Sequence, residues 1–289
     1  MLEFDVLVVG LGAAGMAAAA EIAGGGKCSV LAVDSRPYLG GVLPQCIHSG
    51  FGNGLTGPEY EKKLEKEFLT SGAIYMLETT VVSVSPERFA FLSCRAGMLS
   101  VHFKRLVLAT GCREIPFGAL GIAGTRPKGI FTAGQVQEMI NLMHADIGGD
   151  AVIIGCGDLG MIVARRLVLS DKKVRAIIEK NPTYGGLHRN YANCIEKYDL
   201  PVLFSTTVEE VIGRKQLQAV RLSDGETIPC ETLIVAAGLK EEQTLVKSLG
   251  SPDWLTLCGN CRAVCSMVET AVGQARDTAV DLRKAEGKE

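Results

Sequence analysis

Residues 6–15 read VLVVGLGAAG, and residues 151–160 read AVIIGCGDLG. In each stretch an apolar, strand-like run leads into glycines spaced G-x-G-x-x-G, and a helix-like run follows. An acid stands 24 residues after the first glycine in both copies, at Asp34 and at Glu179. This pattern is typical of a strand–turn–helix that binds the diphosphate of a dinucleotide at the helix N-terminus. One copy is weak support, whereas two copies with equal spacing predict two dinucleotide sites.

The composition fits a globular chain with real hydrophobic cores. The 289 residues are enough for one large or two medium domains, and 47% of them are hydrophobic. A net charge of −2 offers no basic surface for nucleic acid. The glycines and acids within residues 5–24 interrupt the apolar run there, so no membrane span is expected. The ten cysteines, without a signal peptide ahead of them, predict reduced thiols in a cytoplasmic protein.

The N-terminal part predicts a βαβ unit. We expect a strand at residues 4–9, a helix at 14–23 and a strand at 29–33, which ends at the first acid. Thr56 and Glu59 form a capping-box pattern at the start of the next helix. The following segment predicts four short strands that form an antiparallel meander and lead into a core strand, at residues 79–85, 88–94, 99–103 and 105–111.

The second half repeats this plan. TTVVSV at residues 79–84 returns as TTVEEV at 206–211, and RLVLATG at 105–111 returns as TLIVAAG at 232–238, both at an offset of 127. The glycine motifs repeat at an offset of 145, so about 18 residues between motif and meander are absent from the second copy. Such self-similarity predicts two related nucleotide-binding domains.

The predicted fold class is therefore α/β, with two Rossmann-like βαβ domains, each carrying a small antiparallel meander. The chain leaves the first domain near residues 112–120 and returns with a strand at 254–259 and a helix from Ser266. We expect the first domain to be discontinuous, with the segments 1–114 and 245–289, and the second domain to span residues 115–244.

At this point the sequence resembles a known class. It is similar to the two-dinucleotide-binding-domain flavoproteins, the thioredoxin-reductase-like FAD/NAD(P)-dependent oxidoreductases. Two segments, GGVLPQCIHSGFG at 40–52 and ATGCREIPFG at 109–118, further resemble a bacterial subgroup. Members of that subgroup are often paired with a flavoprotein that oxidises glycerol 3-phosphate, or with subunits of proline, amine or opine dehydrogenases. The other segments that carry the resemblance are residues 10–15, 30–36, 105–114, 129–137, 155–166 and 258–260.

The resemblance implies that the first loop binds FAD. Gly10 permits the tight turn, Gly12 lets the backbone approach the phosphates, and Gly15 lets helix and strand pack closely. Asp34 is expected to accept hydrogen bonds from the adenosine ribose. Either Val81 or Val82 is expected near the adenine. The expected FAD-binding residues are Gly10, Gly12, Ala14, Gly15, Asp34, Ser35, Arg36, Gly40, Gly41, Val82, Ala109, Thr110, Gly111, Gly259 and Asn260.

The second loop is expected to bind NAD(P). A carboxylate at Glu179 favours the free 2′-hydroxyl of NAD over the 2′-phosphate of NADP, although Lys180 and Arg189 lie near enough in sequence to serve a phosphate. NAD is therefore favoured over NADP. The doublet Arg165–Arg166 is interpreted as a solvated helix face. The expected NAD-binding residues are Gly155, Gly157, Asp158, Leu159, Gly160, Glu179, Ala237 and Gly238.

Catalytic candidates are sparse. Relatives carry a redox dithiol either near residue 46 or just before the second glycine motif, but here only Cys46 stands in the first place and no cysteine in the second. Cys46 could contact the flavin or attack a substrate, or it could be an apolar part of the pocket wall. His48 could donate a proton to the flavin or serve structure alone.

The C-terminal segment departs from the pattern of relatives, which usually have Gly-Asp where this chain has Gly259-Asn260. Cys258, Cys261 and Cys265 surround this departure. They could pack near the flavin, or Cys258 and Cys261 could form a redox pair. A metal site is not expected, because no fourth ligand is close in sequence.

The function implied is hydride transfer between a nicotinamide nucleotide and FAD. Since no substrate-specific acid–base pair stands out, the chain is expected to act as the electron-transfer subunit of a dehydrogenase complex, or as a homo-oligomer. The alternatives are a stand-alone disulfide reductase using Cys258 and Cys261, and a nucleotide-binding scaffold that has lost its flavin.

Overall fold

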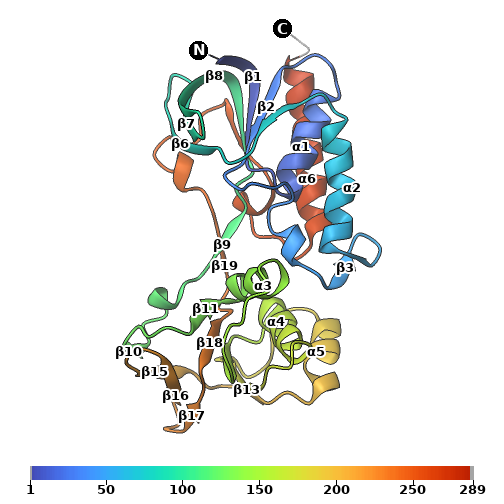
Figure 1. The fold of residues 1–289 in the computed structure, drawn as a ribbon. Helices are drawn as coiled ribbons and strands as arrows, with labels where there is room; N and C mark the ends of the chain where they lie inside the picture. The colour runs from blue at the N-terminus through green and yellow to red at the C-terminus, as the bar shows by residue number, and fades with distance from the viewer. Residues whose placement is uncertain (1, 287–289) are drawn as a thin grey trace. The chain divides into compact units, whose positions relative to one another are not determined.

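The computed structural model describes residues 2–286 and divides by internal contacts into two compact units. Unit 1 holds the described residues up to Arg113 and those from Lys240 onward, and unit 2 holds Glu114–Leu239. The two connecting segments, β9 (Cys112–Glu114) and β19 (Leu239–Glu241), pair with each other as short strands. The chain thus contains two α/β folds, and the first is built from both ends of the sequence (Figure 1).

Unit 1 contains a parallel sheet covered by three helices. Its remaining elements are, in chain order, β1 (Leu2–Val9), α1 (Ala13–Ala23), β2 (Val30–Val33), the 3-10 turn η1 (Leu43–Gln45), β3 (Ser49–Phe51), β4 (Leu55–Thr56), α2 (Gly57–Leu69), β5 (Ile74–Met76), β6 (Thr80–Val84), β7 (Phe89–Cys94), β8 (Gly97–Leu108), η4 (Thr244–Val246), β20 (Leu255–Leu257), η5 (Gly259–Cys261) and α6 (Val268–Glu286).

Successive side chains of β1 point to opposite faces of this sheet, and each face has its own hydrophobic core. Val6 and Val8 pack against the helices α1, α2 and α6, which stand side by side in Figure 1. Leu7 and Val9 pack on the other face, against residues of β7 and β8 and the segment before β20. A strand covered on both faces is apolar at every position, which explains the unbroken run at 6–9.

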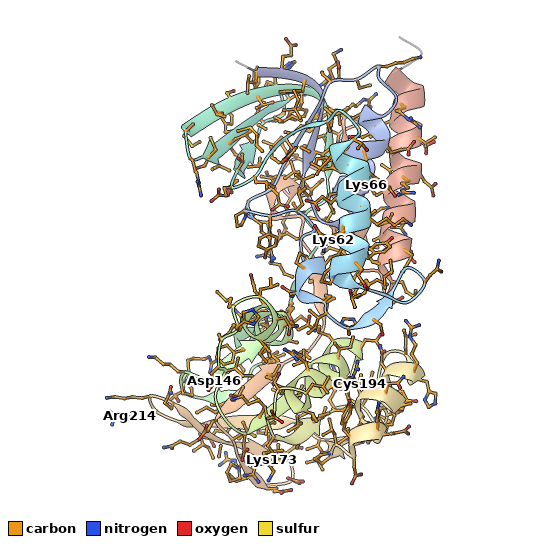
Figure 2. All side chains as sticks on the ribbon, turned by 45° about the vertical axis from the view of Figure 1, so that its right-hand side comes forward. Lys62, Lys66, Asp146, Lys173, Cys194 and Arg214 are labelled. Atoms are coloured by element: carbon orange, nitrogen blue, oxygen red, sulfur yellow. The ribbon has the colours of Figure 1, made fainter. Side chains whose placement is uncertain are left out.

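Helix α2 shows how local pattern and core agree. Thr56 and Glu59 form the predicted capping box at its start. Tyr60, Leu64 and Phe68 form its buried stripe. Figure 2 labels Lys62 and Lys66 on the same helix, one turn apart and away from that stripe.

Two predicted strands of unit 1 are in fact one. The runs at residues 99–103 and 105–111 belong, as far as Leu108, to the single strand β8, because its residues 101–108 pair with β1, from Leu2↔Val101 to Val9↔Leu108. Its first half also pairs antiparallel with β7. The meander is therefore a continuation of the parallel sheet, with strand order β5-β2-β1-β8-β7-β6 and β20 paired to β8.

Unit 2 repeats the design on a smaller scale. Its elements are η2 (Phe117–Ala119), β10 (Ala123–Gly124), β11 (Ile130–Thr132), α3 (Ala133–Asn141), β12 (Ala151–Ile154), α4 (Asp158–Val168), β13 (Val174–Ile178), α5 (His188–Cys194), η3 (Glu196–Tyr198), β14 (Val202–Leu203), β15 (Val208–Gly213), β16 (Leu217–Leu222), β17 (Thr227–Pro229) and β18 (Thr232–Val235).

The parallel strands of the two units have the same order. Unit 2 has β14-β13-β12-β18-β11, and unit 1 has β5-β2-β1-β8-β20. The fifth strand differs in origin: β11 precedes the glycine motif of its unit, whereas β20 returns after unit 2. The predicted α/β fold with two Rossmann-like units is thus confirmed. The last helix starts at Val268, two residues beyond the predicted start.

Candidate functional site: two glycine loops and a cavity

The first glycine loop joins β1 to α1. The backbone at Gly10 has φ +100°, and a Cβ there would lie 2.5 Å from the carbonyl oxygen of Ala109. A Cβ at Gly15 would lie 1.8 Å from the carbonyl oxygen of Gly10, so only glycine lets α1 pack this closely on the loop. The result is a helix whose N-terminal N–H groups are presented at the end of β1, the usual place for a phosphate.

Asp34 fixes this loop from the next strand. Its Oδ2 accepts a hydrogen bond from the Leu11 N–H at 2.6 Å, and its Oδ1 accepts one from the Arg36 N–H at 2.9 Å. Each carboxylate oxygen has a further lone pair for a ligand hydroxyl. The acid that the sequence assigns to a ribose therefore also holds the loop in shape.

A cavity of about 510 Å³ opens in front of the loop and lies wholly within unit 1. Its volume is within the range of small-molecule sites. The start of α1, the end of β2, the glycine pair at 40–41 and the C-terminal segment all contribute to its wall. The lining residues are Val9, Gly10, Gly12, Ala13, Ala14, Val33, Asp34, Ser35, Arg36, Gly40, Gly41, Val42, Leu43, Thr79, Thr80, Val81, Ala109, Thr110, Gly111, Cys112, Glu242, Leu245, Asn260, Cys265, Met267, Val268 and Ala271.

Three of the predicted FAD residues do not line this cavity. Gly15 acts behind it, in the packing of α1. Gly259 does the same, because a Cβ there would lie 2.5 Å from Cβ of Ala14. Val82 is 57% exposed, and Val81 takes its place on the wall. The pairing of β6 with β7 shifts register between Val81 and Ser83, so the regular alternation of the strand is interrupted here.

The C-terminal segment contributes Asn260 to the cavity wall. Its Oδ1 accepts a hydrogen bond from the Cys265 N–H at 3.0 Å, and its Nδ2 contacts Cys112 Sγ at 3.6 Å. Cys112, Cys265 and Met267 all line the cavity. Sequence reasoning missed Cys112 and Met267, since no spacing rule connects residue 112 with the last helix, whereas packing near the flavin was one of its two interpretations of Cys265.

Cys46 and His48 are not among the cavity residues, so the structure does not bring the predicted catalytic pair to this site. The 3-10 turn η1 redirects the chain after Leu43, and the Gly57 N–H donates to the Cys46 carbonyl oxygen at 2.8 Å. Burial raises the pKa of the Cys46 thiol to about 12, which leaves it protonated and a poor nucleophile. His48 instead lies against Phe51, with ring centroids 5.1 Å apart.

The two cysteines of the C-x-x-C sequence, Cys258 and Cys261, are not bonded to each other in the structure. Both are buried free thiols, and they belong to cores on different faces of the sheet, Cys258 to the helix side and Cys261 to the other. Cys261 Sγ donates to the Leu108 carbonyl oxygen at 2.9 Å. Burial raises the pKa of Cys258 to about 12. The packing interpretation is the one that this geometry supports.

The second glycine loop has the same construction. Gly155 has φ +100°, with a Cβ position 2.3 Å from the Ala236 carbonyl oxygen, and the Cβ position of Gly160 is 2.1 Å from the Gly155 carbonyl oxygen. Ala236 is therefore the counterpart of Ala109, and sequence reasoning missed it even though the offset of 127 locates it. Leu159 faces inward and packs against the core of unit 2.

Glu179 holds the second loop as Asp34 holds the first. Its Oε2 accepts from the Cys156 N–H at 2.8 Å, and its Oε1 accepts from the backbone and side-chain N–H groups of Asn181 at 2.9 and 2.7 Å. A second counterpart is the pair Gly185–Gly186, 145 residues after Gly40–Gly41. Gly40 N–H donates to the Leu11 carbonyl oxygen and Gly185 N–H to that of Cys156, both at 3.0 Å.

Ala237 and Gly238 lie two and three residues beyond the end of β18, the strand that pairs with β12 beside the second loop. The Gly238 carbonyl oxygen accepts a hydrogen bond from the Ile115 N–H at 3.0 Å. Within residues 2–286 no group of three or more His, Cys, Asp or Glu side chains is placed to hold a metal ion. No helix in the described part of the chain is both long and apolar enough to cross a membrane.

Comparison with known proteins agrees with this geometry. The family model described as pyridine nucleotide-disulphide oxidoreductase matches residues 4–252. The chain belongs to this family. It is thus an oxidoreductase of the FAD- and NAD(P)-dependent, thioredoxin-reductase-like class, as its sequence resemblance implied. A crystal structure of thioredoxin reductase from T. acidophilum shares the fold, with a TM-score of 0.79, 22% identity and 99% of each chain covered.

Two curated relatives are named as parts of larger enzymes. One is a subunit of opine oxidase from Agrobacterium tumefaciens, which is 26% identical over 278 residues that cover 86% of this chain and 54% of that protein. The other is the hydrogen cyanide synthase subunit HcnB of Pseudomonas aeruginosa, which is 27% identical over 297 residues that cover 90% of this chain and 62% of that protein. The chain therefore spans a little over half the length of these relatives.

Proposed function

We propose that this family member transfers hydride between a nicotinamide nucleotide bound at the second loop and FAD bound at the first. The observation that carries the proposal is the matched construction of the two loops. Asp34 and Glu179 make equivalent hydrogen bonds, and the first loop opens on a cavity of about 510 Å³. FAD, when bound, supplies the hydride and electron chemistry, and the protein supplies position and electrostatics.

The residues of the cavity wall fit FAD. Gly12, Ala13 and Ala14 bring backbone to the wall at the start of α1, where the helix dipole favours a diphosphate. Asp34 stands at the end of β2 for a ribose, and Asn260 stands on the C-terminal side with its amide held in place. These features argue against the scaffold hypothesis. A chain that had lost its flavin would not require glycine and alanine at the start of α1, where they leave the backbone accessible to a ligand.

Anaerobic titration of the purified flavoprotein with NADH tests the proposal. We expect a visible flavin spectrum that bleaches on addition of NADH and returns with an artificial dye. A protein that purifies with FAD but is not bleached by NADH or NADPH would refute hydride transfer. A protein that binds no flavin on reconstitution would refute the first site.

The nucleotide is proposed to be NAD rather than NADP. Glu179 is only 6% exposed, and a 2′-phosphate beside its carboxylate would meet like charge. We expect wild type to discriminate against NADPH by roughly tenfold or more in apparent Kd, as one unfavourable charge contact allows. Glu179→Gln removes the charge and should therefore lower the ratio of the apparent Kd for NADPH to that for NADH severalfold. The ratio is the measurement, because any loosening of the loop weakens both nucleotides alike; an unchanged ratio would count against Glu179 as the discriminator.

The physiological role is proposed to be that of an electron-transfer subunit. The two curated relatives named as parts of larger enzymes motivate this, together with the lack of a substrate-specific acid–base pair among the described residues of the cavity wall. The stand-alone disulfide reductase is not favoured, because Cys258 and Cys261 lie in separate cores. Co-purification of the chain from its native source with a second dehydrogenase polypeptide, rather than alone, is the expected result.

A further inference from the structure

Asp158 begins α4 at the point where the second loop turns into the helix. Its Oδ1 accepts hydrogen bonds from the Leu187 N–H at 2.8 Å and from Asn190 Nδ2 at 2.7 Å. Gly186 packs directly on this carboxylate, since a Cβ there would lie 2.5 Å from Asp158 Oδ1. A negative charge therefore stands in the first turn of α4 and ties residues 186–190 to it.

The first loop differs at this position. The residue 145 positions earlier is Ala13, which lines the cavity and carries no polar group. Gly41, the counterpart of Gly186, packs against backbone alone, with its Cβ position 2.9 Å from Cα of Gly12. The two loops share the φ angles of their first glycines, the close approach of glycine to backbone, and the hydrogen bond to the acid of the next strand. They differ in charge at the helix N-terminus, where only the second loop carries a carboxylate.

We propose that Asp158 makes the second dinucleotide a readily exchanged co-substrate, by competing with its diphosphate for the N-terminus of α4. The inference rests on the proposed function, in which this loop binds NAD(P)H. The positive end of a helix favours an anion, and Asp158 supplies one from the chain itself. The incoming diphosphate must share that position with a carboxylate, so it binds less tightly than at a loop with alanine. Asp158 is a specificity-determining residue in this sense: it separates a nucleotide that leaves at each turnover from one that stays.

The variant Asp158→Asn tests this directly. Asparagine keeps the shape and the Oδ1 acceptor for Leu187 and Asn190 but removes the charge. We expect NADH to bind about three- to tenfold more tightly, the range that a helix-terminal charge supports. The gain should appear mainly as slower NADH release in stopped-flow experiments. The matched control is Asp171→Asn, an exposed aspartate beyond the other end of α4 with φ +55°, which asparagine tolerates; this control should leave NADH affinity unchanged.

The reciprocal variant Ala13→Asp places the carboxylate in the first loop. We expect it to lower the FAD retained after dialysis while NADH affinity stays at the wild-type value. Equal or weaker NADH binding by Asp158→Asn would overturn the inference and leave the proposed function standing. Absence of NADH binding by wild type and by both Asp158→Asn and Asp171→Asn would overturn the inference and the nucleotide site together. Binding by Asp158→Asn alone would support both.

Discussion

The variant Gly157→Val should retain its flavin, and its Kd for NADH should rise by about a hundredfold or more. Gly157 has φ −90° and ψ −179°, which valine adopts without strain, and a Cβ there meets no protein atom within 4 Å. The added side chain therefore occupies space where the diphosphate must approach backbone N–H groups. Hydrogen bonds to a charged group contribute roughly 1.5–3 kcal/mol each, so the loss of one or two accounts for this factor.

NADH affinity, flavin content and thermal stability together separate this effect from misfolding. Gly118→Val is the matched control, because Gly118 lies in the same unit and its Cβ position is also open. We expect the control to bind NADH like wild type. Valine is a poorer N-cap residue than glycine, so a fall of about 1 kcal/mol in the free energy of unfolding is acceptable for Gly157→Val. Unimpaired NADH binding by Gly157→Val would remove the second loop from the mechanism.

The variant Gly12→Val should give a folded protein without FAD. Gly12 lines the cavity with φ −72° and ψ −171°, and its Cβ position has a single neighbour, Cα of Gly41 at 3.9 Å. The valine side chain therefore extends into the cavity rather than into the core. We expect the Kd for FAD to rise by about a hundredfold or more, from the same loss of phosphate contacts, so that flavin content after reconstitution falls to about a tenth or less at a FAD concentration roughly ten times the wild-type Kd.

The two valine variants serve as controls for each other. Gly12→Val should still bind NADH at unit 2, and Gly157→Val should still hold FAD at unit 1. Circular dichroism and thermal unfolding of Gly12→Val establish that the fold is kept. Normal FAD content in Gly12→Val would mean that the diphosphate does not pass this loop, and the assignment of the cavity to FAD would be wrong.

Much of this site could be predicted from the sequence because its determinants are local. A glycine at positive φ and an acid at a fixed distance act within one βαβ unit, so Gly10, Gly155, Asp34 and Glu179 are visible as a pattern. The offset of 145, applied beyond the motif itself, would also have located the pair Gly185–Gly186.

What the sequence could not predict depends on contacts between distant segments. Cys46 follows the glycine pair at 40–41, yet η1 turns it from the cavity, and that turn is held by Gly57 in the next helix. The C-x-x-C spacing of Cys258 and Cys261 suggests a pair, but the 3-10 turn η5 begins directly after Cys258 and ends at Cys261, and the two side chains belong to different cores. The register shift between Val81 and Ser83 in β6 is likewise invisible in the sequence, which left open which of the two valines at 81–82 faces the cavity.

The origin of strand β20 has a consequence for biosynthesis. Unit 2 is complete once Leu239 has been translated, whereas the sheet of unit 1 lacks β20, and its helix layer lacks α6, until residues 255–286 have been translated. The N-terminal part of unit 1 therefore has one strand edge unpaired while the whole of unit 2 is synthesised. The proposed FAD site is completed equally late, because residues between Asn260 and Ala271 form part of the cavity wall, and an unpaired sheet edge is exposed until then.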